Sequence, residues 1–269
     1  MGMSQKFVVK PGSSVKLAEH DPDYCGAFKG KRDAQRQIAR SLKRLQELQY
    51  LLYAEDRRAV LVVLQGMDAA GKDGTIRHVM GPLNPQGCRV TSFKEPTREE
   101  LSHDFLWRIH KAAPRSGEIG IFNRSHYEDV LIARVHDLVP EPVWSRRYRQ
   151  INAFEEGLAA NNVHTLKFYL HISKDEQLDR FKDRLKDPTR LWKANPEDFK
   201  ERQHWDDYMQ AYQDALTRCS TSHAPWYVIP SNHKWFRNLA VCEIIVETMD
   251  KLDMQYPKAL FDVSKIKLK

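Results

Sequence analysis

The residues best suited to chemistry form a glycine-rich segment at positions 66–74, which reads Gly-Met-Asp-Ala-Ala-Gly-Lys-Asp-Gly. It directly follows the apolar run 59–64, and a buried strand leading into Gly-x-x-x-x-Gly-Lys is the pattern of a phosphate-binding loop. In such a loop, backbone N–H groups face the anion, the next helix adds its positive dipole end, and the lysine reaches the phosphates. We therefore expect phosphate contacts from Gly66, Asp68, Ala69, Ala70, Gly71, Lys72, Asp73 and Gly74.

Position 73 departs from the ordinary form of this loop. Nucleotide-binding loops have a magnesium-binding Ser or Thr after the lysine, and this chain has Asp73. Glycine-rich turns also occur without function. The continuous apolar strand before the segment, and a following stretch that can continue as a helix to Gly81-Pro82, favour a true phosphate site. Asp73 indicates that this site handles phosphate in an unusual way.

A second polar cluster, residues 123–129, follows the apolar run 118–122. Arg124 can offer a planar fork of donors to phosphoryl oxygens. Glu128 or Asp129 can hold a magnesium ion directly or through water. The segment can also be an ordinary loop with a capping serine, but its expected place on the rim of the phosphate loop favours a functional role.

A third charged region, at about residues 180–202, is expected to form a helical lid. Arg180 and Arg184 lie four residues apart, so both can point from one helix face to a single ligand. A lid that carries arginine onto a transferring phosphoryl group excludes water and stabilises negative charge. A solvated helical hairpin is the alternative, because residues 174–202 contain nine basic and eight acidic side chains.

The composition limits the class of protein. Lys and Arg outnumber Asp and Glu by 43 to 36 in 269 residues, an excess that suits a polyanionic partner. Zinc-finger spacing, a basic tail and aromatic RNA-binding motifs are absent from the sequence, so no nucleic-acid partner is expected. A signal peptide and a run of membrane-spanning length are also missing, and four scattered cysteines look like reduced thiols. We expect a cytoplasmic protein with no membrane partner.

Alternating strands and helices predict one α/β domain covering residues 1–269. An amino-terminal arm and an amphipathic helix take up about 1–55, with an apolar stripe at Ile38, Leu42, Leu45, Leu48 and Leu52. Capping boxes open helices at Thr97 and Ser173, and the first of these helices should carry Leu101, Phe105 and Ile109 inward. Apolar runs predict a parallel sheet of about five strands with helices on both faces, at 59–64, 88–93, 118–122, 165–172 and 226–230.

Four motifs together resemble the polyphosphate kinase 2 family, and the resemblance covers residue 7 to about 257. They are residues 66–74, Phe122-Asn123-Arg124-Ser125, Leu191-Trp192-Lys193 and Ala224-Pro225-Trp226-Tyr227. The resemblance implies a P-loop kinase fold with three layers and a helical lid. It also implies magnesium-dependent, reversible transfer of phosphoryl groups between inorganic polyphosphate and nucleotides. Its implied site residues are Asp68, Lys72, Arg124, and Arg180 or Arg184.

The sequence departs from the common family pattern at Asn123, where many members have Asp. Glu128 follows shortly and can supply the missing carboxylate, a combination that resembles the subgroup acting on both AMP and ADP. We therefore expect Asp68 and Glu128 to bind Mg²⁺, with Mn²⁺ as an alternative. Adenine nucleotides are the expected acceptors, guanine nucleotides are a further option, and a homo-oligomer is expected. Basic residues expected to guide the polymer are Lys29, Lys31, Lys94 and Arg115.

Two other functions remain open at this point. An ATP-dependent nucleoside monophosphate kinase shares the loop and the lid, but Asp73 argues against it. A non-catalytic module that binds polyphosphate or RNA would keep the loop as an anion site, yet it has no need of both the Arg124 cluster and a lid. Polyphosphate-dependent phosphorylation of AMP and ADP is the leading hypothesis.

Overall fold

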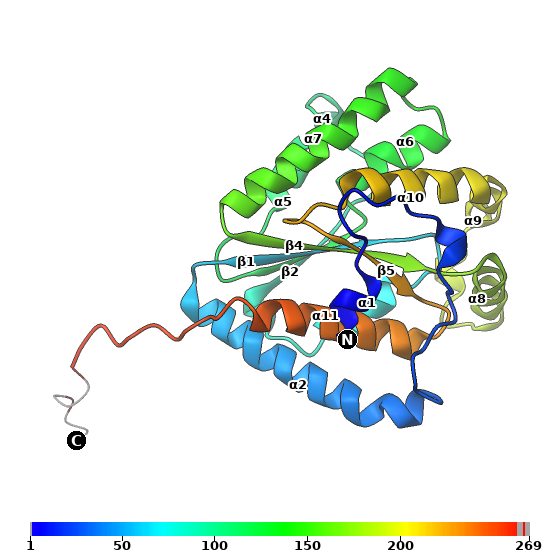
Figure 1. Cartoon of the computed structure of the whole chain (residues 1–269). Coiled ribbons are helices and arrows are strands. Elements are labelled where there is room, and N and C mark those ends of the chain that lie inside the picture. Colours follow the sequence, from blue (N-terminus) through cyan, green and yellow to red (C-terminus); the bar gives the residue numbers. More distant parts are fainter. Residues whose placement is uncertain (1, 263–265, 267–269) are drawn as a thin grey trace.

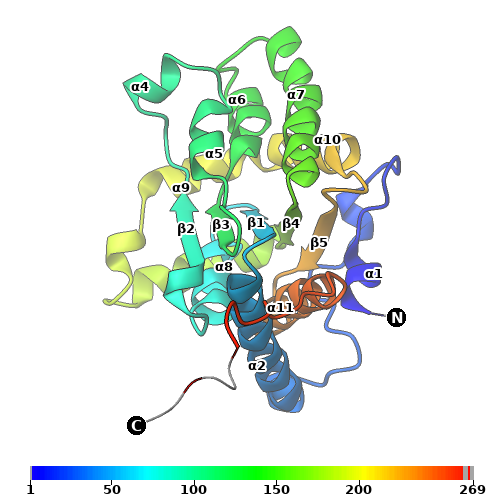
Figure 2. The ribbon, with the colours of Figure 1, turned by 90° about the vertical axis from the view of Figure 1, so that its left-hand side faces the viewer.

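A parallel sheet of five strands forms the centre of the computed structural model, which describes residues 2–262 and 266. The strands lie in the order β2-β3-β1-β4-β5, and every neighbouring pair is parallel (Figure 2). This confirms the predicted α/β fold; residues 1, 263–265 and 267–269 of the expected domain 1–269 lie outside the described residues. The strands β1 to β5 span Ala59–Gln65, Cys88–Ser92, Ile119–Asn123, Val163–His171 and Trp226–Pro230.

Strand β1 lies at the centre of the sheet and is covered on both faces. All residues of Ala59–Gln65 are buried, and the strand pairs with β3 on one side and β4 on the other. A continuous aliphatic run suits such a strand because neither face meets water. From β1 the chain continues to β2 on one side of the sheet, and from β3 it crosses β1 to reach β4 on the other side. The glycine-rich segment after β1 therefore lies where the connections to the two sides diverge, which is the usual ligand position in such sheets.

Helices on the two faces of the sheet complete the three layers seen in Figure 1. One face carries α2 (Lys31–Glu55), α3 (Lys72–Thr75) and α11 (Lys234–Asp250), with α1 (Met3–Phe7) beside α11. The opposite face carries α5 (Trp107–Ala112), α6 (Ile132–Val135), α7 (Glu141–Ala160) and α10 (Trp205–Cys219). Short turns of helix connect these elements: η1 (Leu17–Glu19), η2 (Ile76–Met80), η3 (Pro85–Gly87), η4 (His126–Val130) and α4 (Arg98–Leu101).

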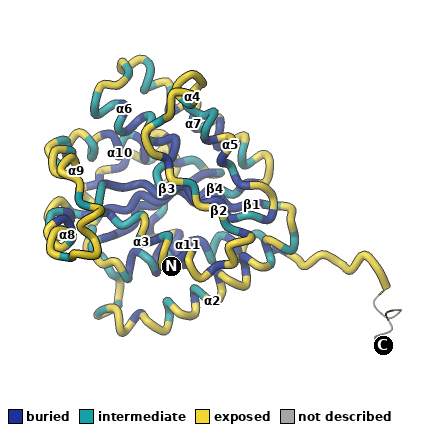
Figure 3. Tube along the Cα trace, turned by 180° about the vertical axis from the view of Figure 1, so that it is seen from behind, coloured by how far each residue is buried: buried dark blue, intermediate teal, exposed yellow. Residues whose placement is uncertain are grey.

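The predicted amphipathic helix is present as α2, which packs on α11. Leu45, Leu48 and Leu52 are buried, whereas Ile38 and Leu42 near the start of the stripe are only half-buried. The opposite side of α2 is exposed along its length (Figure 3). The helix ends where Asp56 takes a left-handed conformation with φ 51°, a common way to terminate a helix.

The expected helix after Thr97 is shorter than predicted. The capping box itself is confirmed, because Thr97 and Glu100 each bond the other's backbone N–H. However, α4 ends at Leu101, whose side chain is 70% exposed, so the prediction that it points inward was wrong. A new helical turn begins at Asp104, whose carboxylate accepts a hydrogen bond from the Leu106 N–H. It leads into α5, in which Ile109 is buried.

The predicted lid region stands beyond the carboxyl ends of the strands (Figure 1). It consists of α8 (Lys174–Lys186), η5 (Leu191–Lys193), α9 (Pro196–Glu201) and η6 (Arg202–His204). Its first helix begins before residue 180. Ser173 caps it, but Glu176 pairs with Arg180 rather than completing the expected capping box. In the described part of the chain, no helix is both long and apolar enough to span a membrane.

Candidate active site at the phosphate-binding loop

The segment 66–74 forms a tight loop between β1 and α3. Gly66, Ala69 and Gly71 all have positive φ angles, of 152°, 62° and 110°. A Cβ atom at Gly66 would lie 2.8 Å from the Leu170 carbonyl oxygen, so a side chain there would strike β4. The turn delivers the chain to the start of α3 at Lys72, where the free N–H groups of a helix favour an anion.

The Lys72 side chain folds back over the loop. Its Nζ donates to the carbonyl oxygens of Gly66 at 2.6 Å and Met67 at 3.3 Å. Burial lowers the pKa of Lys72, and the negative charge of Asp68 opposes this shift. The ammonium group is therefore held at the mouth of the loop, the position from which a lysine can reach a bound phosphate.

Arg124 connects the ends of β3 and β1. Its backbone, at φ 61°, donates an N–H to the Leu64 carbonyl at 3.1 Å, and its Nη2 donates to Asp68 Oδ1 at 3.1 Å. Burial lowers the pKa of Arg124, but Glu128 and Asp68 outweigh it, so the pKa is raised overall. The structure thus places the second polar cluster beside the phosphate loop.

Asp68 and Glu128 form a pair of carboxylates suited to magnesium. Both interact electrostatically with Lys72 and with Arg124, so they share one region of the site. No group of three or more metal-binding side chains occurs among the described residues. Two carboxylates nevertheless suffice for Mg²⁺, which usually binds through one or two of them together with substrate phosphates and water. The residues present fit this ion.

Asp129, the other carboxylate of this segment, is engaged elsewhere. Arg147 Nη1 donates to Asp129 Oδ1 at 3.0 Å, from the helix α7 on the far side of the segment. Burial raises the pKa of Asp129 to about 6 although Arg147 opposes the change. Of the two acids considered from the sequence, the structure brings Glu128 to the loop.

Asp73 joins three segments of the chain. Its Oδ1 accepts from Asn123 Nδ2 and its Oδ2 from Lys193 Nζ, each at 2.9 Å. Burial raises the pKa of Asp73, but the hydrogen bonds from Lys193 and Asn123 outweigh it and lower the pKa overall. The residue that replaces the usual Ser or Thr therefore links the phosphate loop to the end of β3 and to the lid.

We expect this link to contribute modestly to polymer binding. Asp73→Asn and Lys193→Met should each raise KM for polyphosphate by roughly two- to fivefold, because exposed ion pairs contribute about 1 kcal/mol or less. The double variant should be no worse than either single variant, which a double-mutant cycle measures. Lys200→Met, which breaks an exposed lid pair with Glu197, is the control. Fully additive losses in the double variant would contradict the link.

The structure corrects the prediction that Arg180 and Arg184 point to one ligand. Arg180 is buried behind the loop and donates to four backbone carbonyls, those of Ala69, Ala70, Ser231 and Asn232. Arg184 instead donates to Asp198 at 2.8 Å and so ties α8 to α9. The two side chains diverge because the first half of α8 packs against the loop while its second half projects into the lid.

The basic residues expected to guide the polymer are divided between two edges of the sheet. Lys94 follows β2, so it lies on the edge that carries the loop. Lys29 and Lys31 are exposed where α2 begins, on the same side (Figure 1). Arg115 precedes β3 and therefore lies at the opposite edge, since all strands are parallel. This placement removes Arg115 from the expected path.

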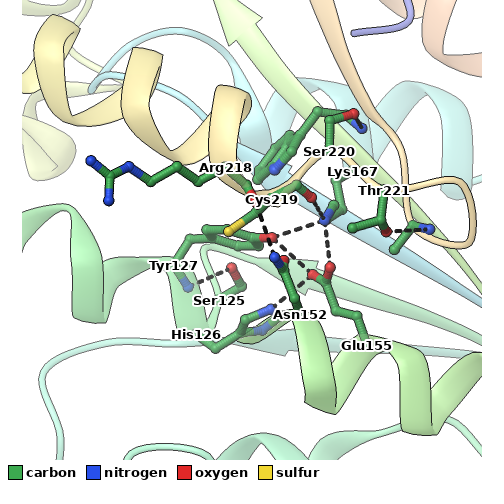
Figure 4. A network of polar contacts seen from close by, with 12 residues as sticks. Ser125, His126, Tyr127, Asn152, Glu155, Lys167, Arg218, Cys219, Ser220 and Thr221 are labelled. Carbon is green, nitrogen blue, oxygen red and sulfur yellow. Dashed lines mark hydrogen bonds and ion pairs between the residues drawn. The ribbon is translucent and has the colours of Figure 1, made fainter. Parts of the chain in front are cut away.

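A buried polar network supports the segment after β3 (Figure 4). Lys167 Nζ donates to Glu155 at 2.5 Å and to the Tyr127 hydroxyl at 2.8 Å, and Glu155 also contacts His126 at 3.2 Å. Lys167, Glu155, Tyr127 and His126 are all fully buried. Tyr127 and His126 belong to η4, which also carries Glu128, so the network fixes the backbone from which that acid projects.

Sequence reasoning missed several residues that shape the loop. Gln177 Nε2 donates to the Asp68 carbonyl, and Arg237 Nη1 donates to the Ala70 carbonyl. No motif marks either residue. The available signal for Arg237 is an arginine directly beside the apolar residues Trp235 and Phe236 and shortly before the apolar run 239–242, where a buried cation needs a specific partner.

The fold and the loop together define the class of protein. A central parallel sheet with this glycine-rich turn after its middle strand is the mark of a phosphate-binding P-loop protein. The chain also matches the family model described as Polyphosphate kinase 2 (PPK2) over residues 29–257. It therefore belongs to the polyphosphate kinase 2 family, which confirms the resemblance seen in its motifs.

Relatives in sequence and structure cover nearly the whole chain. A protein of Meiothermus ruber described as AMP/ADP-polyphosphate phosphotransferase is 52% identical over 255 residues, 94% of this chain and 96% of its own. An ADP-polyphosphate phosphotransferase of Rhodopseudomonas palustris is 45% identical, with 95% and 92% covered. The crystal structure of Polyphosphate Kinase 2 from Arthrobacter aurescens TC1 superimposes with a TM-score of 0.94 at 44% identity, covering 98% and 94% of the chains.

Proposed function

We propose that this enzyme transfers phosphoryl groups from inorganic polyphosphate to AMP and to ADP, forming ADP and ATP. The observation that carries the proposal is the meeting of Lys72, Arg124, Asp68 and Glu128 at the mouth of the loop. Relatives of nearly full length are described with AMP/ADP or ADP as the nucleotide. The reaction is reversible, because one phosphoanhydride bond replaces another.

The chemistry requires little proton transfer. The nucleophile is a nucleotide phosphate oxygen that is already ionised near neutral pH, so catalysis rests on positioning and on neutralising charge. Lys72 and the loop N–H groups hold phosphate, and Arg124 stabilises charge on the transferring group. We assign Arg180 to positioning the loop and Arg184 to holding the lid together, in accordance with their contacts.

Magnesium would be held by Asp68 and Glu128 together with substrate phosphates, and it would neutralise charge that develops on them. Asp68 also orients Arg124, whose Nη2 donates to it at 3.1 Å. The expected Mn²⁺ alternative follows from the same oxygen donors, because carboxylate oxygens also suit that ion. Self-association of the chain stays a prediction, to be checked by sedimentation.

The decisive experiment supplies polyphosphate as the sole phosphoryl donor. We expect the enzyme to form ADP from AMP and ATP from ADP. Chromatography of the nucleotides measures both products. An enzyme that uses ATP but not polyphosphate with AMP would be a nucleoside monophosphate kinase instead. Tight binding of the polymer without any nucleotide product would indicate a non-catalytic module.

We expect Glu128→Gln to raise the magnesium concentration for half-maximal rate by about tenfold, since a neutral amide is a poorer ligand than a carboxylate. The rate is measured across a magnesium titration at saturating substrates. Asp129→Asn is the matched control, because Asp129 is the neighbouring acid and pairs with Arg147. An unchanged magnesium requirement in Glu128→Gln would remove this residue from the metal site.

A further inference from the structure

Arg237 is a buried cation that lies behind the phosphate loop, on the side away from the expected phosphate. It lies in the first turn of α11 and is only 2% exposed. Its Nη1 donates to the Ala70 carbonyl at 3.1 Å, and its Nε and Nη2 both donate to the neutral amide oxygen of Asn238. Among the described residues, no carboxylate forms an ion pair with it. Burial, together with the positive charge of Arg180, lowers the pKa of Arg237 to about 9.

A buried charge without a partner is destabilising, so its presence requires an explanation. Arg180 differs in this respect, because Glu176 pairs with it at 2.8 Å. The two guanidinium groups converge on one atom, since both donate to the Ala70 carbonyl oxygen at 3.1 Å. The loop therefore rests on two positive charges, of which only one is neutralised by the protein.

The contact with Ala70 also fixes the direction of the loop. The described peptide bonds are all trans, so the Gly71 N–H points away from the Ala70 carbonyl. Because that carbonyl faces the two arginines behind the loop, the N–H faces forward, where the phosphate is expected. The motif glycines fit the same arrangement: a Cβ at Gly71 would lie 1.7 Å from Arg237 Nη1, and one at Gly74 would lie 3.0 Å from Nη2.

We propose that Arg237 is a positioning residue of the phosphate site, which orients the Ala70–Gly71 peptide and supplies from behind the loop a positive charge that bound phosphate neutralises. This inference rests on the proposed function, since it takes the ligand of the loop to be a phosphate of polyphosphate or of a nucleotide. It explains why two glycines are needed on the side of the loop that faces away from the ligand. It also gives α11 a direct part in binding.

The test measures the binding of inorganic tripolyphosphate to the full chain by calorimetry, at low salt and without nucleotide. Arg237→Gln removes the charge but keeps a hydrogen-bond donor, and it should raise Kd by about tenfold, the scale seen when a group supporting a ligand from behind is lost. Arg237→Lys keeps the charge and should bind within about threefold of the wild type. Arg44→Gln, which removes one exposed cation that pairs with Glu47 of α2 and Asp250 of α11, is the charge-matched control and should bind as the wild type does.

Two results would overturn the inference. An unchanged Kd in Arg237→Gln would show that the site does not use this charge, and equal weakening in Arg237→Lys would show that charge is not the property that matters. Circular dichroism establishes folding. If the neutral variant does not fold, a Kd of folded Arg237→Lys more than about threefold above that of the wild type would overturn the inference. If the wild type itself fails to bind tripolyphosphate, the proposed function fails as well. Equal binding of tripolyphosphate by the wild type and by Arg237→Gln would contradict this inference without contradicting the proposed function.

Discussion

Replacing Lys72 by alanine should lower kcat/KM for AMP and polyphosphate by about 10²–10³-fold, or ~3–4 kcal/mol, the scale of losing one preorganised charge-stabilising donor. The loop N–H groups would remain, but the ammonium group that neutralises charge on the transferring phosphate would be gone. The measurement is a steady-state assay with polyphosphate as donor. The ratio of kcat/KM to that of the wild type gives the lost transition-state stabilisation directly.

Controls separate this chemical effect from damage to the loop. Lys72 Nζ donates to the Gly66 and Met67 carbonyls, so circular dichroism and a melting curve should accompany the assay. Lys16→Ala removes a lysine of similar type from an exposed pair on the amino-terminal arm and should keep full activity. Near-normal turnover by a folded Lys72→Ala variant would show that the loop is not the phosphoryl-transfer site.

The largest expected effect on stability comes from Lys167. Lys167→Met fills a similar volume but leaves Glu155 buried without its main cationic partner, since the Lys167–Glu155 contact at 2.5 Å is the closest in the network. Breaking a fully buried pair in this way costs about 3–5 kcal/mol. Urea unfolding followed by circular dichroism should show this decrease in the free energy of unfolding.

A second variant and a control make the measurement specific. Lys167→Met combined with Glu155→Gln removes both charges and should recover part of the lost stability, because no unpaired charge then remains. Lys182→Met breaks an exposed pair with Asp179 and should change the free energy of unfolding by about 1 kcal/mol or less. Equal losses of unfolding free energy in Lys167→Met and Lys182→Met would mean that the buried pair contributes no more to stability than an exposed one.

The sequence was most informative where structure depends on neighbouring residues. The strand that ends in the glycine-rich loop is a local pattern, and so is the strand that delivers Arg124; both were predicted, and their parallel pairing brings the two loops together. The capping box at Thr97 was likewise predicted from residues three apart, whereas Glu176 pairs with Arg180 and does not complete the box expected at Ser173. The predicted length of the helix after Thr97 was wrong, because Asp104 starts a new helical turn. This local signal outweighed the apolar spacing that begins at Leu101.

Contacts between distant segments could not be read from the sequence. Lys193 reaches Asp73 across 120 positions, and Arg237 reaches Ala70 across 167. Neither pairing has a spacing rule, because it depends on how α8, α9 and α11 pack around the loop. Arg180 shows the same limit. Helical spacing predicted that it lies on the same helix face as Arg184, but not that Arg180 is buried against the loop.

The arrangement around β1 has a consequence for how such an enzyme can change its substrates. The groups that act on phosphate lie on the loops after β1 and β3, which the Arg124 N–H to Leu64 contact binds together at the rigid centre of the sheet. The segments beside them, from η5 to η6, are short, and none of their residues is buried. Selection can therefore alter the peripheral segments with little cost to stability while the phosphate machinery stays intact. Relatives described as AMP/ADP-polyphosphate and as ADP-polyphosphate phosphotransferases are the outcome that such a separation favours.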